Sequence, residues 1–400
     1  MKRFIETFQN IWKIEELKQR ILTTLGLILI YRLGSYVVLP GIDTDVLTAA
    51  NANADDGGII ALINAFAGGA FSRASIFGLG IMPYITASII IQLLGMAVPY
   101  FQKMQKEGES GRKKINQYTR FLTVAVTAVQ APGYLAAQVY SKPGVVAIDH
   151  AWFGIQSTLI LVAGTMFIMW LGERITDKGI GNGISVLIMI GIISRLPFAI
   201  TSEFGSRLQS AGGGLIMFLL EIVFLLFIIV SCILLVQGTR RIPVQYAKKI
   251  VGDKQIGGVR QYLPLKVNAA GVMPIIFAQA IMFIPAAVSG FSGGTGGVFA
   301  DRYGFWYNFI FATLIIAFTY FYTAIMINPN QLADDMKKNG GFVPGVKPGK
   351  TTAEFIDAVM SRITLPGAIF LAFVAILPSI AIKLGINSAF ADFFGGTSLL

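Results

Sequence analysis

The sequence predicts an all-α polytopic membrane protein, and three observations support this fold class. First, 54% of the 400 residues are hydrophobic and only 13% are charged, whereas soluble proteins average about 25% charged residues. Second, about nine apolar stretches approach the roughly 20 residues that one crossing of the bilayer needs. Third, basic residues collect in every second loop, as they do in the short cytoplasmic loops of membrane proteins.

The predicted spans follow one another along the chain. They cover residues 21–39, 75–99, 118–140, 151–172, 180–201, 214–237, 268–289, 305–328 and 364–384. A segment near 58–72 contains too many glycine and polar residues to cross. Residues 393–400 are expected to begin a tenth span that is truncated here.

Charge predicts that the N-terminus is cytoplasmic. The inside segments are then 1–20, 100–120, 173–179, 238–267 and 329–363, and they hold 25 of the 32 Lys and Arg residues. The polar start of the chain contains no cleavable signal peptide, so the first span is expected to direct insertion. The basic face either follows the insertion rule alone or also binds an anionic partner such as lipid headgroups or RNA. Charge does not separate these two interpretations.

Two inside loops are longer than a connection requires, and long loops are often functional. The loop 238–267 contains RRIPVQYAKK, whose alternation favours a β-hairpin above the membrane. In the loop 329–363, Thr351 or Thr352 with Glu354 behind it forms a capping pattern. This pattern predicts a short amphipathic helix over TTAEFIDAVMSR.

The chain is expected to divide into two halves, residues 1–205 and 206–400, joined by a glycine-rich outside loop. Five spans in each half would give the halves opposite orientations, as in the inverted repeats of membrane transport folds. No internal sequence repeat supports this division, which depends on the number of spans and the position of the linker.

The sequence predicts no catalytic, metal or cofactor site. It contains no nucleotide-binding loop and no HExxH, and Cys232 and His150 are the only residues of their types. Glu221 is the clearest acid inside a span, and either a structural or a functional role fits it. Coupled transporters usually carry ionisable groups near the midplane, and this chain has few of them.

Isoleucine recurs at a spacing of four in two spans. Ile81, Ile85 and Ile89 share a helical face of GIMPYITASIIIQLLG, and Ile184 and Ile188 share a face of GIGNGISVLIMIG. This spacing serves helix packing or lipid contact in most spans and lines a pore in a few. The pattern alone leaves both roles open.

Motifs from the first span to the last residue match one known family. They are YRLGSYVVLPGID (31–43), FAGGAFSRASIFGLGIMPYITASIIIQLL (66–94), KEGESGRKKINQYTR (106–120), TMFIMWLGERITDKGIGNGIS (165–185), RRIPVQYAKK (240–249), LPLKVNAAGVMPIIFA (263–278), NPNQLADDMKKNGGFVPGVKPG (328–349) and FFGGTSLL (393–400). In these motifs the chain resembles the SecY family, the central subunits of the bacterial protein-conducting channel.

The resemblance implies a ten-span SecY-type channel of two inverted five-span halves. A polypeptide would cross through its centre or leave sideways between the halves into lipid. By motif position, the constriction ring consists of Ile81, Ile85, Ile184, Ile188 and Ile276. An apolar ring dewets when empty and fits around any sequence in transit, so it blocks ions without selecting a substrate.

The resemblance also implies a plug near residues 57–75 that hinges at its glycines. The plug candidates are Ile59, Ile60, Leu62, Ile63, Phe66, Gly68 and Gly69. A re-entrant outside loop without a gating role is the alternative. The lateral gate between the halves would use Gln92, Thr119, Asn268 and Gln279.

The two long inside loops correspond to the family's docking surface for the ribosome and the SecA motor. The docking candidates are Arg240, Arg241, Lys248, Lys249 and Lys347. Lys347 stands in GVKPG where the family usually has arginine, so the charge is kept but the planar fork for bidentate contacts is lost. Other implied partners are SecE, SecG, signal sequences, unfolded preproteins and membrane lipids, with no DNA and no cofactor.

The resulting hypothesis is a protein-conducting channel in a bacterial plasma membrane, with a thylakoid membrane as the alternative. It is driven by SecA with ATP or by the ribosome, and it is not an enzyme. A secondary transporter for a small solute is the runner-up. A structural scaffold is a third reading, and it leaves the isoleucine spacing and the plug unexplained. A natural nine-span channel would leave the second half incomplete, so a truncated tenth span is preferred.

Overall fold

The computed structural model describes residues 12–52, 64, 67–146, 149–209, 214–246, 249–251, 254–256, 260–279, 281–282, 303–386 and 388–394. Within these ranges, six helices are long and apolar enough to cross a membrane, or up to seven if a bent pair counts as one crossing. The predicted all-α polytopic class is therefore confirmed. The chain forms two compact units, Met1–Phe198 and Ala199–Leu400.

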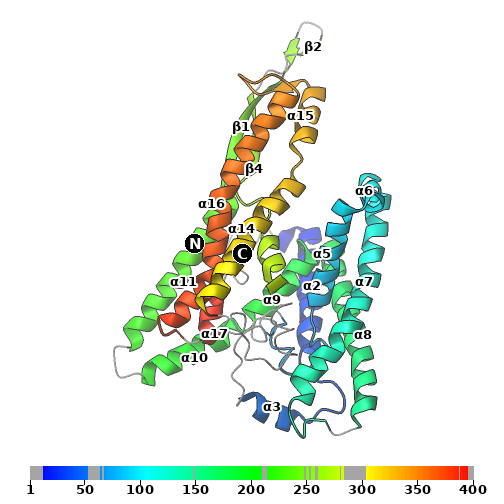
Figure 1. Cartoon of the computed structure of the whole chain (residues 1–400), viewed down its shortest axis with the longest axis vertical. Helices are drawn as coiled ribbons and strands as arrows, with labels where there is room; N and C mark the ends of the chain where they lie inside the picture. Colours follow the sequence, from blue (N-terminus) through cyan, green and yellow to red (C-terminus); the bar gives the residue numbers. More distant parts are fainter. Residues whose placement is uncertain are drawn as a thin grey trace. The chain divides into compact units, whose positions relative to one another are not determined.

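The first unit is a helical bundle around α8 (Figure 1). Its helices are α2 (Glu15–Gly34), α3 (Thr44–Ala52), α5 (Met82–Ala97), α6 (Pro99–Lys106), α7 (Glu109–Leu135), α8 (His150–Lys178) and α9 (Gly183–Ile193). α8 contacts α2, α5, α7 and α9, so it is the helix that the others share. α7 continues into a π-helical turn, Ala136–Tyr140.

Hydroxyl groups inside α7 are satisfied by the helix itself. Thr119, Thr123 and Thr127 form a buried stripe, and each hydroxyl donates to the carbonyl four residues earlier. Such back-bonding lets a span bury threonine without a partner on another helix.

The span predicted over 75–99 starts too early in the sequence. Residues 67–81 form consecutive turns, and helix α5 begins only at Met82. Two backbone bonds hold the turns to the chain before them, from Leu39 N to Ala74 O and from Ile76 N to Val37 O, both at 2.9 Å. Each buried backbone group needs a partner, and hydropathy does not reveal that this partner lies outside the segment.

The first span is also shifted relative to its prediction over 21–39. α2 begins at Glu15 and ends at Gly34, because a helix extends through polar residues that a hydropathy window excludes. Arg20 on this polar first part pairs with Glu16 at 3.0 Å, one turn earlier. Such pairs support exposed helical turns beyond the membrane.

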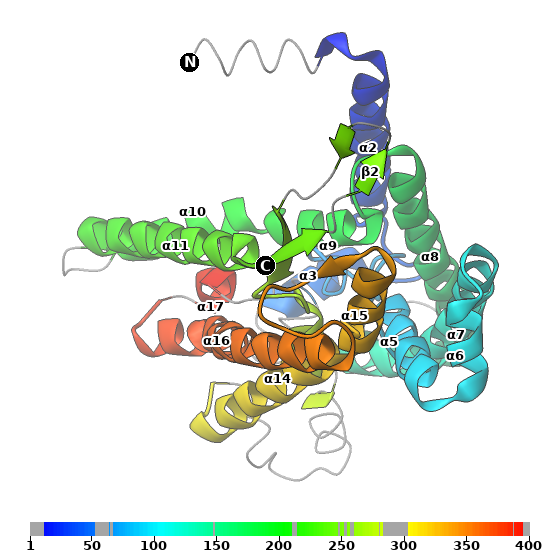
Figure 2. The same cartoon turned by 90° about the horizontal axis from the view of Figure 1, so that it is seen from above.

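The second unit combines long helices with a small sheet. Its helices are α10 (Leu196–Gln209), α11 (Gly214–Gln237), α14 (Phe305–Met326), α15 (Pro329–Lys338), α16 (Lys350–Lys383) and α17 (Ser388–Ala391), followed by the 3-10 turn η2 (Asp392–Phe394). α14 and α16 lie along one another in both views (Figures 1 and 2). Of the span predicted over 268–289, residues 273–279 and 281–282 are helical and the rest after 279 lies outside the described residues.

The predicted hairpin is confirmed in the second unit. β1 (Thr239–Tyr246) pairs antiparallel with β4 (Arg260–Lys266) on one side and with β5 (Gly341–Phe342) on the other. β2 (Lys249–Val251) and β3 (Lys254–Ile256) form a second ribbon. The larger sheet covers α15 and α16 through a buried cluster of Ile242, Val244, Leu265, Met336, Val343, Ile356 and Met360.

The segment TTAEFIDAVMSR is helical as predicted, but the predicted short length is wrong, because the segment is the first part of α16. No threonine side chain caps the helix; Thr352 Oγ1 instead donates to the Lys347 carbonyl at 2.8 Å. Ile356 and Met360 bury this polar part of α16 against the sheet. Their packing joins the segment to the apolar helix that follows.

Candidate functional sites: constriction, plug and docking surface

Two constriction candidates lie at the start of α5. Ile81 is the N-cap residue of this helix, and the Ile85 backbone N–H donates to its carbonyl at 3.1 Å. Both side chains are buried, with 6% and 8% of their surface exposed. The helix therefore places them one turn apart, as the sequence predicts.

Ile184 and Ile188 lie one turn apart on α9 and are half-buried. The side chain of Asn182 caps the helix, since its Oδ1 accepts the Ile184 N–H at 3.1 Å. Gly183 lies tightly against α8, where an added Cβ would come within 2.7 Å of the Ile175 Cβ. The cap and this close approach together fix the position of Ile184.

Ile276 is the fifth candidate and belongs to the second unit. It is half-buried and follows Ile275, which is fully buried. The complete ring would combine residues of both units, and its closure stays a prediction.

Gly68 and Gly69 fix a bend at the end of the plug region. Five other plug candidates, Ile59, Ile60, Leu62, Ile63 and Phe66, lie outside the described residues. The two glycines have positive φ angles of +61° and +86°. At Gly68 an added Cβ would lie 2.6 Å from Arg32 Nη1 and 3.0 Å from the Gly191 carbonyl oxygen. Backbone conformation and lack of space therefore both require glycine there.

The turns after this bend are tied to two helices. Tyr134 Oη of α7 donates to the Phe71 carbonyl, and Asn51 Nδ2 of α3 donates to the Ser72 carbonyl, both at 2.8 Å. Lys142 Nζ in turn donates to Asn51 Oδ1. Sequence reasoning did not single out these residues, because the first two bonds join positions 63 and 21 residues apart.

Two arginines meet at the Gly68 carbonyl. Arg73 Nη2 donates to it at 3.0 Å and Arg32 Nη1 at 3.5 Å, and both guanidinium groups lie over the Tyr36 ring. Burial lowers the pKa of Arg73, Tyr36 opposes this, and the positive charges of Arg32 and Arg195 lower it further. Sequence reasoning did not single out these three arginines, although their position outside the basic inside segments was a signal that could have found them.

The described docking candidates lie on the second unit. Arg240 and Arg241 are exposed on β1, and Lys347 is exposed in the turn between β5 and α16. Lys248 lies outside the described residues, and Lys249 is described by its backbone in β2. Lys347 lines an open groove of about 640 Å³ together with Gly345, Val346, Thr351, Glu354 and Phe355.

The lateral-gate candidates are divided between the units. In the first, Gln92 Nε2 of α5 donates to Ser88 Oγ at 3.3 Å, and Thr119 lies buried on α7, which packs against α5. In the second, Asn268 is buried and its Oδ1 has no hydrogen-bond partner among the described residues, and Gln279 is half-buried. A gate between the halves stays a prediction.

Comparison with known proteins decides the family. The sequence profile of SecY matches residues 75–400. The chain belongs to the SecY family. Within this family, the protein translocase subunit SecY of Streptomyces scabiei is 42% identical over 413 aligned residues, which cover 99% of this chain and 94% of the relative. SecY of Halalkalibacterium halodurans is 42% identical over 410 residues, covering 98% and 93%.

Solved structures confirm the SecY-type fold. A protein-conducting channel matches with a TM-score of 0.66 at 17% identity, covering 96% of this chain and 88% of that chain. Sec61 in the canine ribosome–channel complex matches with a TM-score of 0.58 at the same identity and coverage. The yeast Ssh1 complex bound to the 80S ribosome matches with a TM-score of 0.63 at 14% identity, covering 95% and 88%.

Proposed function

We propose that this chain forms the pore of a protein translocase in a bacterial plasma membrane. Signal-bearing polypeptides cross through it, and membrane proteins leave it sideways into the lipid. SecY-family membership over nearly the whole chain is the observation that carries the proposal. SecA with ATP, or the translating ribosome, supplies the energy.

The proposed pore closes at an apolar ring of Ile81, Ile85, Ile184, Ile188 and Ile276. Support comes from the helical placement of the first four, one turn apart in two helices. An apolar constriction has no groups that bind ions or particular side chains. It therefore blocks ions when it contains no water, and it allows a polypeptide of any sequence to pass. Catalysis is not part of this role.

The plug candidates complete the seal from the outer side. Support comes from the bend at Gly68 and Gly69 and from the turns that follow it, which hydrogen bonds from Tyr134 and Asn51 hold in place. The lateral gate at Gln92, Thr119, Asn268 and Gln279 separates two inverted halves in this proposal.

SecA and the ribosome dock on the cytosolic side, at Arg240, Arg241, Lys248, Lys249 and Lys347. Support comes from the exposure of both arginines and of Lys347, and from arginine's two-pronged contacts with phosphate or carboxylate. Of the similar structures, one is Sec61 in a ribosome–channel complex and another is the Ssh1 complex bound to a ribosome. SecE and SecG complete the assembly, and the N-terminus faces the cytoplasm.

The test is translocation of a signal-bearing preprotein into vesicles that contain this chain with SecE. We expect protease-protected preprotein only when SecA and ATP are both present. The same preprotein without its signal sequence is the matched control and stays accessible to protease. Absence of protection in an intact complex would contradict the proposal, and solute uptake would then test the transporter hypothesis.

A further inference from the structure

The first turns of α14 carry three exposed aromatic side chains that the proposed pore does not use. Phe305, Trp306 and Phe309 are 68%, 61% and 55% exposed. We call them the aromatic cluster. It lies at the end of α14 that the charge pattern predicts on the outer side. A contiguous apolar surface of this kind usually marks the place where a protein meets a partner or a membrane.

The three rings of the aromatic cluster pack on one another. The ring centroid of Phe305 lies 5.6 Å from that of Trp306 and 6.2 Å from that of Phe309, and the last two centroids are 6.4 Å apart. Within the described residues, these are the ring contacts that the three side chains make. Another face of α14 is buried beside α16, where Tyr307 and Phe311 join the core (Figure 1). The cluster therefore contributes to a surface and not to that core.

Trp306 brings a polar group to this apolar surface. Among the described residues, no hydrogen bond involves its indole N–H. A tryptophan favours a place where its ring meets apolar groups while its N–H reaches water or another acceptor. The boundary between lipid headgroups and acyl chains is such a place, and tryptophan is enriched there in membrane proteins.

The position of the cluster along the chain matches such a boundary. Asp301 and Arg302 come directly before it in the sequence, and no charged residue occurs from Tyr303 to Ala333. α14 has 22 residues, which gives a length of about 33 Å, and the hydrocarbon core is about 30 Å thick. A crossing by α14 therefore places its first turn at one edge of the core.

We propose that the aromatic cluster is an interfacial anchor that binds the lipid leaflet on the outer side. The Trp306 N–H donates to lipid ester or phosphate oxygens or to interfacial water, and the rings of Phe305 and Phe309 lie against the upper parts of the acyl chains. The partner is the lipid surface, because the helix length and the charged residues before the cluster place it at the edge of the bilayer. The anchor then fixes the depth of α14 in the membrane.

Quenching of tryptophan fluorescence by brominated lipids tests the depth of the cluster. The full chain is placed in vesicles with tryptophan-free versions of its partner subunits. Trp306 becomes the one emitter when the other three tryptophans are replaced by phenylalanine, namely Trp12, Trp152 and Trp170. We expect bromine near the headgroup end of the acyl chain to quench Trp306 more strongly than bromine near the methyl end.

Two variants without Trp306 calibrate this depth. Ala317→Trp places the emitter on an exposed position in the middle of α14, and bromine near the methyl end should quench it most. Tyr262→Trp places the emitter on the exposed side of β4, where no brominated lipid should quench it and its emission should lie at longer wavelength.

Each outcome decides for or against the anchor. A quenching profile of Trp306 equal to that of Ala317→Trp or of Tyr262→Trp would overturn it. Emission at short wavelength that no brominated lipid quenches would show that a protein covers the cluster, and this would also overturn the proposal. A nitroxide on Phe309→Cys in a Cys232→Ser background measures the same depth with all four tryptophans in place. Because neither readout involves translocation, both are independent of the proposed pore function.

Removal of the two phenylalanines tests whether the cluster holds α14 at its depth. Phe305→Ala with Phe309→Ala should move the Trp306 emission to longer wavelength and reduce its quenching, because the ring loses its apolar neighbours at the boundary. Ile369→Ala with Phe373→Ala is the matched control, since these two exposed side chains also lie one turn apart, on α16. The control should leave the emission and quenching of Trp306 unchanged. Equal values in both double variants would contradict the anchor.

Discussion

At the scale of single residues, glycine at position 68 is required by two independent constraints. Its φ of +61° is a backbone region that other residues adopt at a cost of about 1–2 kcal/mol. An added Cβ would also lie 2.6 Å from Arg32 Nη1. The bend therefore depends on the absence of a side chain.

Gly68→Ala should destabilise the chain by about 1–2 kcal/mol or more, because it adds backbone strain and a steric contact. Thermal unfolding in detergent measures the loss. Gly26→Ala is the control, since Gly26 lies within α2 with nothing inside 4 Å of an added Cβ. It should be neutral or stabilising by up to about 1 kcal/mol. Equal effects at both positions would contradict the strained bend.

Ile81→Gly combined with Ile184→Gly should raise the resting ion conductance of the channel in planar bilayers. Both changes remove apolar side chains from the proposed ring, so water enters more readily. Ile193→Gly is the control on the same helix, since Ile193 lies at the end of α9 and is 47% exposed. Unchanged conductance in the double variant would count against the ring.

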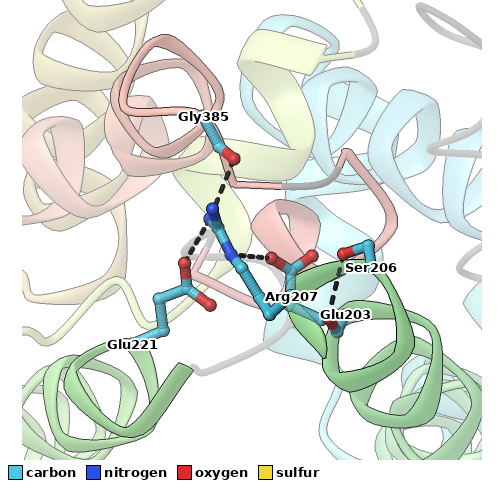
Figure 3. A network of polar contacts seen from close by, with 5 residues as sticks. All are labelled: Glu203, Ser206, Arg207, Glu221 and Gly385. Atoms are coloured by element: carbon cyan, nitrogen blue, oxygen red, sulfur yellow. Dashed lines mark hydrogen bonds and ion pairs between the residues drawn. The ribbon is translucent and has the colours of Figure 1, made fainter. Parts of the chain in front are cut away.

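At the scale of residues, the sequence predicted side chains that recur at a regular spacing. It did not predict side chains whose hydrogen-bond partners lie far away along the chain. The one-turn separation of Ile81 and Ile85 was predictable because a spacing of four fixes a helical face, and their place in a ring stays a prediction. The contact of Tyr134 was not predictable, because an aromatic residue in a span carries no sign that its hydroxyl meets the Phe71 carbonyl. The sequence also showed Glu221 as an acid inside a span, but it did not show that Arg207 Nη2 donates to Glu221 Oε1 at 2.5 Å (Figure 3).

At the scale of elements, Tyr134 shows how a span holds an irregular segment. Its hydroxyl is buried and donates to the Phe71 carbonyl, so α7 supports the turns after the plug region. Tyr134→Phe leaves that buried carbonyl without this donor, at a cost of about 1–3 kcal/mol. Residues 67–75 should then exchange their amide hydrogens faster.

Hydrogen exchange followed by mass spectrometry measures this effect. Tyr262→Phe is the matched control, because Tyr262 is 57% exposed on β4. It should leave exchange in residues 67–75 unchanged. Unchanged exchange in Tyr134→Phe would show that the other bonds hold the segment alone.

The sheet of the second unit presents its basic side chains away from its core. Arg240 and Arg241 are exposed, whereas Ile242 and Val244 are buried against the helices. Arg240→Glu with Arg241→Glu should therefore weaken binding of SecA or ribosomes at least tenfold and leave the thermal unfolding temperature unchanged. Binding measured by co-sedimentation at two salt concentrations should be salt-sensitive in the wild type.

Lys113→Glu with Lys114→Glu is the matched control for this reversal. Both lysines are exposed on α7 in the first unit, and the charge change is the same. Their reversal should affect binding much less. An equal loss in both variants would indicate attraction to basic charge in general rather than a docking site on β1.

Elements were predictable where the local pattern was decisive. The apolar run 214–237 coincides with α11, and the alternation of side chains with a period of two predicted β1. Hydropathy predicted a membrane span where residues 75–81 form turns, because it does not register backbone hydrogen bonds to residues 37–39. It also placed the start of α16 too late, because packing against the sheet keeps the polar first part of this helix folded. In both cases the missing information was tertiary.

At the scale of the whole molecule, the family and the membrane class followed from long motifs and charge sorting. Closure of the ring and the gate depends on both units together, which local patterns do not specify. Orientation is a property of the whole chain that can be tested directly. Positive charge in short loops predicts it independently of any helix boundary.

Lys347→Cys and His150→Cys should be labelled by an impermeant maleimide from opposite sides of the membrane. Lys347 is predicted inside and His150 outside, and both are exposed. A Cys232→Ser background removes the one native cysteine, which is itself buried. Labelling of both positions from the same side would contradict the predicted topology.

The unbroken course of α16 has a mechanical consequence. A helix of 34 residues is about 51 Å long, whereas the hydrocarbon core is about 30 Å thick. One end lies beside the groove at Lys347, and the other reaches the turn whose Gly385 carbonyl accepts Arg207. α16 therefore connects these two places as one continuous helix, so a displacement of its first turn by a docked partner would be transmitted to the far end. Pro366 and Pro378 lie inside the helix and each removes a backbone donor, so bending is expected at these two positions.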